Sequence, residues 1–252
     1  MNFRGLALVL LVMLAAPVQA AESSNKQSLV FEGRDRTYYL YAPDIAAQAP
    51  HPLLVLLHGS GGNGLFMLER WKDVAAREGI VLLAPDSLHT DIGWDIHSDG
   101  PDYIHVAIQA VAAGHAIDFH RLYVFGQSGG AVYALNLAML ESEYFAAVAY
   151  HAGGWRKPAE YHFADYAKRK IPIAMYVGDK DEYFSVDSVQ ATENLLKQRG
   201  FPAELHLLPG RVHAYSDVPV DFHDTVWRFL KANALIDIPK YAPYRFGAAP
   251  PR

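Results

Sequence analysis

Apolar residues along the chain fall into short continuous runs, separated by longer stretches in which apolar positions recur at helical spacing. Continuous apolar runs of about four to eight residues are typical of strands buried on both faces of a sheet. Such strands are expected at 53–57, 80–84, 122–125, 145–150, 171–177 and 203–208. Helices are expected at 66–78, 102–116, 131–138, 186–199 and 219–234, with Gly79 and Gly200 ending two of them.

The order of these elements predicts the fold class. Strands and helices alternate almost throughout, which is typical of an α/β protein with a mostly parallel central sheet and helices on both faces. Two extended runs, 28–32 and 36–41, flank Gly33 and predict an antiparallel hairpin at the sheet edge. The connections are short, so no large lid domain is expected. Polar clusters follow the strand ends, where sheets of this kind bind their ligands.

The first 20 residues have a different pattern from the rest. Arg4 provides a positive start, an apolar run covers 6–16, and small residues lead to Ala20. This pattern predicts a secretory signal peptide at 1–20, cut after Ala20, and hence export to the periplasm or the extracellular medium. The alternative is an uncleaved N-terminus that is amphipathic or anchors the protein in a membrane, although the apolar run is short for a bilayer. A single domain is then expected at 21–240, followed by a Pro- and Tyr-rich tail at 241–252 that packs or stays loose.

Composition narrows the chemistry. The 252 residues include 22 basic and 27 acidic side chains, for a net charge of −5, without a basic block, so a nucleic-acid partner is not expected. Twelve histidines are spread without metal-binding spacing, so no metal site is expected. The absence of cysteine excludes disulfides and a thiol nucleophile, and core packing alone must hold the domain together.

The most informative motif is Gly126-Gln127-Ser128-Gly129-Gly130, which lies between an expected strand and an expected helix. A turn this sharp forces its central residue into a strained backbone and lifts the serine hydroxyl clear of the sheet. Gly126 and Gly130 lack a Cβ and let strand and helix approach closely. Ser128 is therefore a candidate nucleophile. The alternative is a serine that caps a helix after a glycine loop.

A serine nucleophile needs a base and a group that orients the base. Asp181 and His213 each follow an expected strand, and the order Ser, Asp, His is that of the α/β-hydrolases. We assign Ser128 as nucleophile, His213 as general base and acid, and Asp181 as the orienting carboxylate. Competing residues at strand ends or nearby are Asp179, Glu182, His151, His206 and His223.

The same chemistry needs hydrogen-bond donors for an oxyanion. The backbone N–H of Gly129, at the helix start, is one candidate, and Ser60 in the turn His58-Gly59-Ser60-Gly61-Gly62 is the other. The alternatives for this turn are a flexible loop or a phosphate-binding turn, but it lacks the Lys-Ser/Thr ending of a P-loop. His58 is expected to order the turn rather than to act in catalysis.

Aromatic residues gather at the same strand ends. They are candidates for the walls of a pocket for an apolar or aromatic acyl group, or alternatively ordinary core and rim residues. The candidates are Trp94, Trp155, Tyr183, Phe184 and Tyr215.

Several motifs together resemble the α/β-hydrolase superfamily. They are 58–62, Asp102-Tyr103-Ile104, 117–124, 126–130, Gly178-Asp179-Lys180-Asp181 and Val212-His213. More narrowly, the chain is similar to secreted esterases grouped with polyhydroxybutyrate depolymerases and feruloyl esterases, and to the phospholipase/carboxylesterase family. The resemblance implies the triad Ser128, Asp181 and His213 and no cofactor. Gln127 stands where these families more often have leucine or phenylalanine, and Gly129 where they more often have alanine or glutamine, which leaves the substrate class open.

The sequence thus predicts an exported serine esterase, without a stable membrane anchor, that cleaves carboxylic esters through an acyl-enzyme. An open cleft would suit esters that are small and soluble or that protrude from a polymer. Two alternatives remain: a peptidase or amidase on the same scaffold, and a hydrolase fold retained as a non-catalytic binding module.

Overall fold

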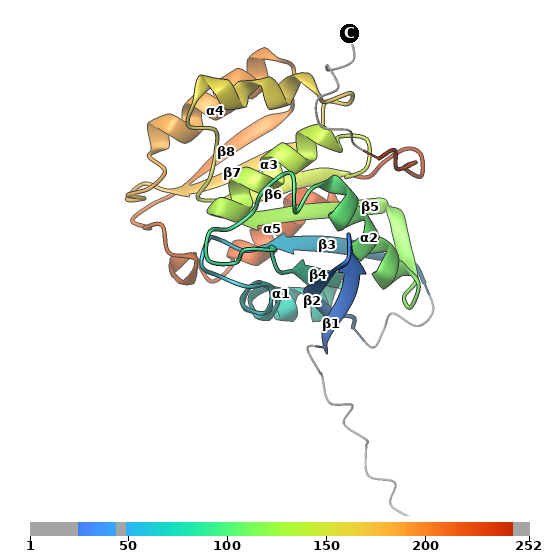
Figure 1. Ribbon diagram of the computed structural model, residues 1–252. Helices are drawn as coiled ribbons and strands as arrows, with labels where there is room; N and C mark the ends of the chain where they lie inside the picture. The colour runs from blue at the N-terminus through green and yellow to red at the C-terminus, as the bar shows by residue number, and fades with distance from the viewer. Residues whose placement is uncertain (1–24, 44–48, 244–252) are drawn as a thin grey trace, which may run out of the picture.

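An eight-stranded sheet runs through the centre of the protein, in the strand order β1-β2-β4-β3-β5-β6-β7-β8 (Figure 1). The computed structural model describes residues 25–43 and 49–243, so the predicted signal peptide at 1–20 and positions 244–252 of the predicted tail lie outside the described residues. The strands are β1 (Asn25–Phe31), β2 (Arg34–Tyr41), β3 (His51–Leu57), β4 (Val81–Pro85), β5 (Ile117–Gln127), β6 (Ala147–His151), β7 (Ile173–Gly178) and β8 (Ala203–Leu208).

The pairing of the strands confirms the predicted fold class. β3 to β8 are parallel to one another, whereas β1 and β2 form an antiparallel hairpin at one edge and β2 pairs antiparallel with β4. Because the inner strands run the same way, their carboxyl ends meet at one side of the sheet. The loops that follow β3, β5, β7 and β8 are therefore neighbours in space, although they are far apart in the sequence.

Helices cover both faces of the sheet, and each face has its own hydrophobic core. One core packs the sheet against α2 (Pro101–Ala112), α3 (Gly129–Leu140) and α4 (Val186–Gln198). The other packs it against α1 (Gly64–Glu78) and α5 (Phe222–Lys231). β3 supplies Leu53, Val55 and Leu57 to the first core and Leu54 and Leu56 to the second. This two-sided burial explains the continuous apolar runs; truncating one such leucine typically costs about 2–5 kcal/mol.

The element boundaries differ from the prediction in a few places. α2 ends at Ala112, because the chain turns at Gly114, where two N–H groups converge on the carbonyl of Val111. α5 begins at Phe222, whose N–H closes a turn on the carbonyl of Pro219. Two 3₁₀ helices, Pro158–Asp165 and Tyr215–Asp217, were not predicted.

The described residues contain no inserted lid domain, and the strand ends are bridged only by loops and the two 3₁₀ helices. None of the helices in 25–43 and 49–243 combines the length and the apolar character needed to cross a bilayer.

Candidate active site

Ser128 lies at the apex of the turn between β5 and α3, with φ 53° and ψ −118°. A non-glycine residue in this region is strained by about 1–3 kcal/mol, and such strain is typical of a nucleophile turn. Space around the turn is tight: a Cβ on Gly126 would lie 2.1 Å from the carbonyl oxygen of Gly130. A Cβ on Gly130 would lie 2.2 Å from the carbonyl oxygen of Leu57. The two glycines therefore permit the close approach that the motif predicts.

Three polar side chains form a hydrogen-bonded chain at this apex. Nε2 of His213 lies 2.8 Å from Oγ of Ser128, and Nδ1 lies 2.9 Å from Oδ2 and 3.1 Å from Oδ1 of Asp181. Oδ1 of Asp181 also accepts the N–H groups of Tyr183 (2.9 Å) and Phe184 (2.8 Å), which hold the carboxylate in place. The side chain of Asp181 is fully buried, and that of His213 is 16% exposed. An imidazole held between a hydroxyl and a carboxylate can take the hydroxyl proton and keep the resulting charge stabilised.

The competing carboxylates do not reach His213. Asp179 instead accepts the N–H of Gly210 at 2.7 Å and thus ties together the turns after β7 and β8. Glu182 is exposed. The turn after β7 therefore directs only Asp181 inward.

The competing histidines occupy other positions. His206, in β8, contacts Glu204 and stacks on Tyr176, and His223, in α5, is hydrogen-bonded to the hydroxyl of Tyr215. His151 is buried beneath the site, and its carbonyl oxygen accepts the N–H of Ser128 at 3.0 Å. Burial lowers the pKa of His151 to about 4, so its ring is neutral near pH 7.

The residues predicted to donate to an oxyanion lie side by side. Gly129 is the first residue of α3, and an N–H at this position has no acceptor within its own helix. The backbone nitrogen of Ser60 lies 3.3 Å from the point that a Cβ on Gly129 would occupy. Ser60, Ser128 and Gly129 line one pocket. The two candidate donor residues thus border the same pocket as Ser128.

His58 orders the turn at 58–62, here called the glycine turn. Nε2 of His58 accepts the N–H of Ser87 at 3.1 Å, so Nδ1 carries the ring proton and donates to the carbonyl of Gly59 at 2.8 Å. Burial lowers the pKa of His58, which favours the neutral ring, and the two hydrogen bonds select its tautomer. The structural role predicted for His58 agrees with these contacts.

A cavity of about 340 Å³ opens beside the Ser128 hydroxyl. Its walls combine apolar side chains with one arginine and one glutamate. The lining residues are Ser60, Ile92, Trp94, Ser128, Gly129, Val132, Gly154, Arg156, Glu160 and Phe184. Of the predicted aromatic residues, Trp94 and Phe184 line the cavity. Tyr183 is exposed and packs its ring against that of His213, with 4.7 Å between centroids.

Two of the predicted pocket residues belong to the core instead. Trp155 is 1% exposed, and its Nε1–H donates to Asn136 at 2.8 Å. Tyr215 is 4% exposed, and its hydroxyl accepts the Nε1–H of Trp71 at 3.0 Å. An aromatic residue just beyond a strand end can turn either into the cleft or under it, and these two turn under it, where their polar atoms find partners.

Sequence reasoning missed several lining residues, of which Arg156 is the most prominent. Its guanidinium stacks 3.8 Å from the centroid of Phe184 and donates to the carbonyl of Tyr183 at 2.9 Å. Arg156 thereby joins the loop after β6 to the turn that carries Asp181. The 3₁₀ helix that follows brings Glu160 to the cavity. Neither residue belongs to a motif, so only the path of the loop reveals them.

Among residues 25–43 and 49–243, no group of three or more His, Cys, Asp or Glu side chains is arranged to hold a metal ion.

This fold, with a strained serine at the turn after β5, defines a protein of the α/β-hydrolase superfamily, as predicted. The model of the dienelactone hydrolase family matches residues 87–221, more than half of the chain, and the chain belongs to this family. Dienelactone hydrolases are one family within the α/β-hydrolase superfamily, so this match specifies the family to which the chain belongs.

Curated relatives carry esterase names. The chain is 30% identical over 184 residues to the putative esterase NocK of Nocardia uniformis, covering 66% of this chain and 50% of the relative. It is 26% identical over 163 residues to feruloyl esterase B of Thermothelomyces thermophilus, covering 60% and 54%. The chain thus spans about half the length of these relatives.

Solved structures share the fold. A thermostable esterase superposes with a TM-score of 0.64 at 18% identity, covering 83% of this chain and 63% of that one. An S-formylglutathione hydrolase from Agrobacterium tumefaciens superposes with a TM-score of 0.63 at 16% identity, covering 82% and 94%. At these identities the likeness extends to the fold alone.

Proposed function

We propose that this protein is a serine esterase that hydrolyses carboxylic esters through an acyl-enzyme. The observation that carries the proposal is the hydrogen-bonded chain from Ser128 through His213 to Asp181, at a strained turn that opens into a cavity. Membership of the dienelactone hydrolase family and the esterase names of the relatives support it.

In the first half-reaction, Nε2 of His213 removes the hydroxyl proton as Oγ of Ser128 attacks the ester carbonyl carbon. The carbonyl oxygen becomes an oxyanion, which accepts hydrogen bonds from the N–H groups of Gly129 and Ser60. Asp181 stabilises the imidazolium formed. Collapse of the tetrahedral intermediate breaks the bond to the alcohol oxygen, and His213 returns the proton to that leaving oxygen.

In the second half-reaction, water takes the place of the Ser128 hydroxyl as the nucleophile and attacks the acyl-enzyme. His213 removes a proton from water, whose oxygen attacks the acyl carbon. The same two N–H groups hold the oxyanion. Collapse then breaks the acyl bond to Oγ, and the proton passes from His213 to Ser128, which releases a carboxylic acid. No cofactor is required by this sequence of steps.

The cavity supports a preference among esters. Trp94, Val132 and Phe184 give it an apolar wall, and its small volume suits a short acyl group. Because no lid domain covers the strand ends in the described residues, the proposed substrates are small esters or ester groups that protrude from a polymer.

Export is the remaining part of the proposal and depends on the pattern at 1–20, which predicts a cut after Ala20. N-terminal sequencing of the protein recovered from the exported and cytoplasmic fractions of its native host tests this part. An exported chain that begins at Ala21 supports it, and a chain that keeps Met1 and stays in the cytoplasmic fraction contradicts it.

The esterase proposal is tested by comparing Ser128→Ala with the wild type on p-nitrophenyl acetate and butyrate. The matched control is Ser28→Ala, which removes an exposed hydroxyl from β1. We expect Ser128→Ala to lose at least about 10³-fold in kcat and the control to match the wild type. A fluorophosphonate probe should label only proteins that retain Ser128. Turnover by Ser128→Ala equal to that of the wild type, or cleavage of peptide amides without cleavage of esters, would reject the proposal.

A further inference from the structure

The loop between β4 and α2, residues 86–100, lies against the glycine turn. Nε1–H of Trp94 donates to the carbonyl of His58 at 2.8 Å, and the N–H of Gly61 donates to the carbonyl of Thr90 at 2.7 Å. The loop thus contacts the glycine turn on either side of Ser60. It also supplies the Trp94 wall of the cavity.

The loop backbone also approaches Ser60 closely at Gly93, which has φ +103°. A Cβ at this position would lie 2.6 Å from Oγ of Ser60. The next residue of the loop, Trp94, stacks its ring on that of Tyr133 in α3, with 4.9 Å between the centroids. A shift of the loop would therefore move both the proposed oxyanion donor and the apolar wall.

One buried carboxylate closes this loop. Oδ1 of Asp99 accepts the N–H of Leu88 at 2.8 Å, and Oδ2 accepts the N–H of Asp95 at 3.0 Å. The hydroxyl of Tyr133 donates to the carbonyl of Asp99. The side chain of Asp99 is 1% exposed. It therefore joins the start of the loop to its middle and anchors its end on α3.

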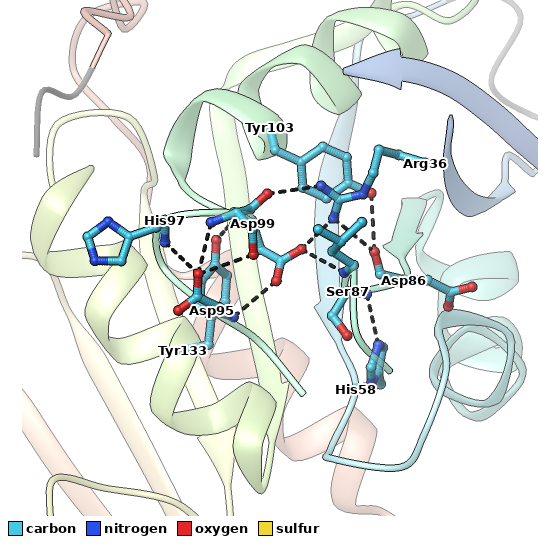
Figure 2. A network of polar contacts seen from close by, with 11 residues as sticks. Arg36, His58, Asp86, Ser87, Asp95, His97, Asp99, Tyr103 and Tyr133 are labelled. Carbon is cyan, nitrogen blue, oxygen red and sulfur yellow. Dashed lines mark hydrogen bonds and ion pairs between the residues drawn. The ribbon is translucent and has the colours of Figure 1, made fainter. Parts of the chain in front are cut away.

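Arg36 of β2 neutralises this carboxylate (Figure 2). Its guanidinium forms an ion pair with Asp99, donates to the carbonyls of Ser98 (3.0 Å) and Asp86 (3.4 Å), and lies 3.6 Å from the centroid of the Tyr103 ring. The side chain is 3% exposed. Arg36 thus connects the loop to the antiparallel hairpin formed by β1 and β2, next to β4.

A buried ion pair is weak support for stability as such, because desolvation of two charges offsets their attraction. Its directional hydrogen bonds nevertheless fix geometry. Here they converge on a loop that has no helix or strand of its own, except a single bridge between His89 and Gly93. The ion pair therefore serves mainly to fix the position of the 86–100 loop.

We infer that Arg36 and Asp99 are positioning residues for the active site. They hold the 86–100 loop so that Gly93 supports Ser60 and Trp94 forms the cavity wall. This inference rests on the proposed esterase function, since it assigns the pair an effect on the oxyanion donors of that reaction. Both side chains are buried, and neither lines the cavity beside Ser128.

The test measures kcat and KM of Asp99→Asn and Arg36→Lys with p-nitrophenyl acetate. A displacement of about 1 Å in a catalytic group can cost about 100-fold. We expect kcat to fall by roughly 10- to 100-fold. KM should change by no more than about twofold, because the acetyl group is too small to depend on the displaced wall. Arg36→Lys should retain more activity than Arg36→Met, since it keeps the charge and loses the forked geometry.

The matched control is Arg169→Met. Arg169 also donates to backbone carbonyls, those of Ser142, Phe145 and Ala146, but at the other end of the sheet. We expect this variant to lower the melting temperature while kcat per folded molecule stays at the wild-type value. This control distinguishes the effect of a general loss of stability on turnover from the effect of a displaced loop.

Gly93→Ala provides a second route, because a Cβ at φ +103° strains the loop backbone and crowds Oγ of Ser60 while leaving the ion pair intact. It does not depend on the folding of the Asp99 variants. It should lower kcat for the acetate ester as they do. If Gly93→Ala, Arg36→Lys and every soluble Asp99 variant turn over like Arg169→Met, the positioning role is refuted. If Ser128→Ala retains activity, the esterase proposal itself fails, which is a separate outcome.

Discussion

Nε2 of His213 lies 2.8 Å from Oγ of Ser128, although 85 positions separate the two residues in the chain. The sheet makes this contact possible, because Ser128 follows β5 and His213 follows β8, and both strands end at the same side. The strained backbone at Ser128 and the stacking of His213 beside Phe184 set the direction of the two side chains.

Asp181→Asn should impair turnover far more than stability. The amide cannot stabilise an imidazolium and favours the wrong tautomer of His213, so we expect kcat for p-nitrophenyl acetate to fall by about 10³- to 10⁴-fold. Asp179→Asn is the matched control and should stay within about tenfold of the wild type, because Asp179 contacts Gly210 instead of His213. Equal losses in the two variants would contradict the assignment of Asp181.

Tyr215→Phe should destabilise the fold and spare the chemistry. The change leaves the buried Nε1–H of Trp71 without its acceptor, which typically costs about 1–3 kcal/mol in the free energy of unfolding. Urea unfolding measures this loss, and kcat/KM per folded molecule should match the wild type. A raised KM with an unchanged free energy of unfolding would instead indicate that Tyr215 contributes to the substrate pocket.

Gly130→Ala should disturb the turn that carries Ser128. The added Cβ would lie 2.2 Å from the carbonyl oxygen of Leu57, so strand and helix must separate, at a cost of about 1–3 kcal/mol. Gly114→Ala is the control, since its Cβ would meet no atom closer than 4.0 Å. Thermal unfolding of both variants distinguishes them; equal melting temperatures would show that the close approach at Gly130 is not required.

The buried Glu141 should make the free energy of unfolding depend on pH. Burial, together with the nearby Asp102, raises the pKa of Glu141 from 4.5 to about 8. A carboxyl group whose pKa is higher in the folded protein favours folding most below the unfolded value, and this contribution is lost as the pH rises from about 4.5 to about 8.

Glu141→Gln removes that term, since the amide stays neutral. The variant should be more stable than the wild type at pH 8, by up to a few kcal/mol, relative to any difference at pH 4. Glu69→Gln is the control, because Glu69 is exposed on α1 and does not act on Glu141; it should show no such difference between the two pH values. Urea unfolding at pH 4, 6 and 8 provides the measurement, and parallel pH profiles for the wild type and Glu141→Gln would refute the prediction.

The local pattern of apolar residues and glycines was sufficient to predict the strands and helices and the motifs between them. Apolar runs such as 53–57 indicate buried strands because both faces of the sheet are covered, and the run Gly126 to Gly130 requires a turn that few other residues could form. The same reasoning failed for Trp155 and Tyr215, because hydrophobicity alone does not distinguish an aromatic wall of a cleft from an aromatic core beneath it.

The sequence by itself determined the fold class, the turn at Ser128 and the strand ends from which Asp181 and His213 come, because these depend on periodicity and on local backbone sterics. Only the tertiary structure decided that Arg36 pairs with Asp99, 63 positions away, and that Arg156 reaches the cavity. In a hairpin at the side of the sheet, an arginine such as Arg36 would be expected to be solvated, and its burial depends on a loop whose path no local pattern encodes. Contacts between distant segments are chosen by the packing of the whole chain, so they emerge only when the chain is folded.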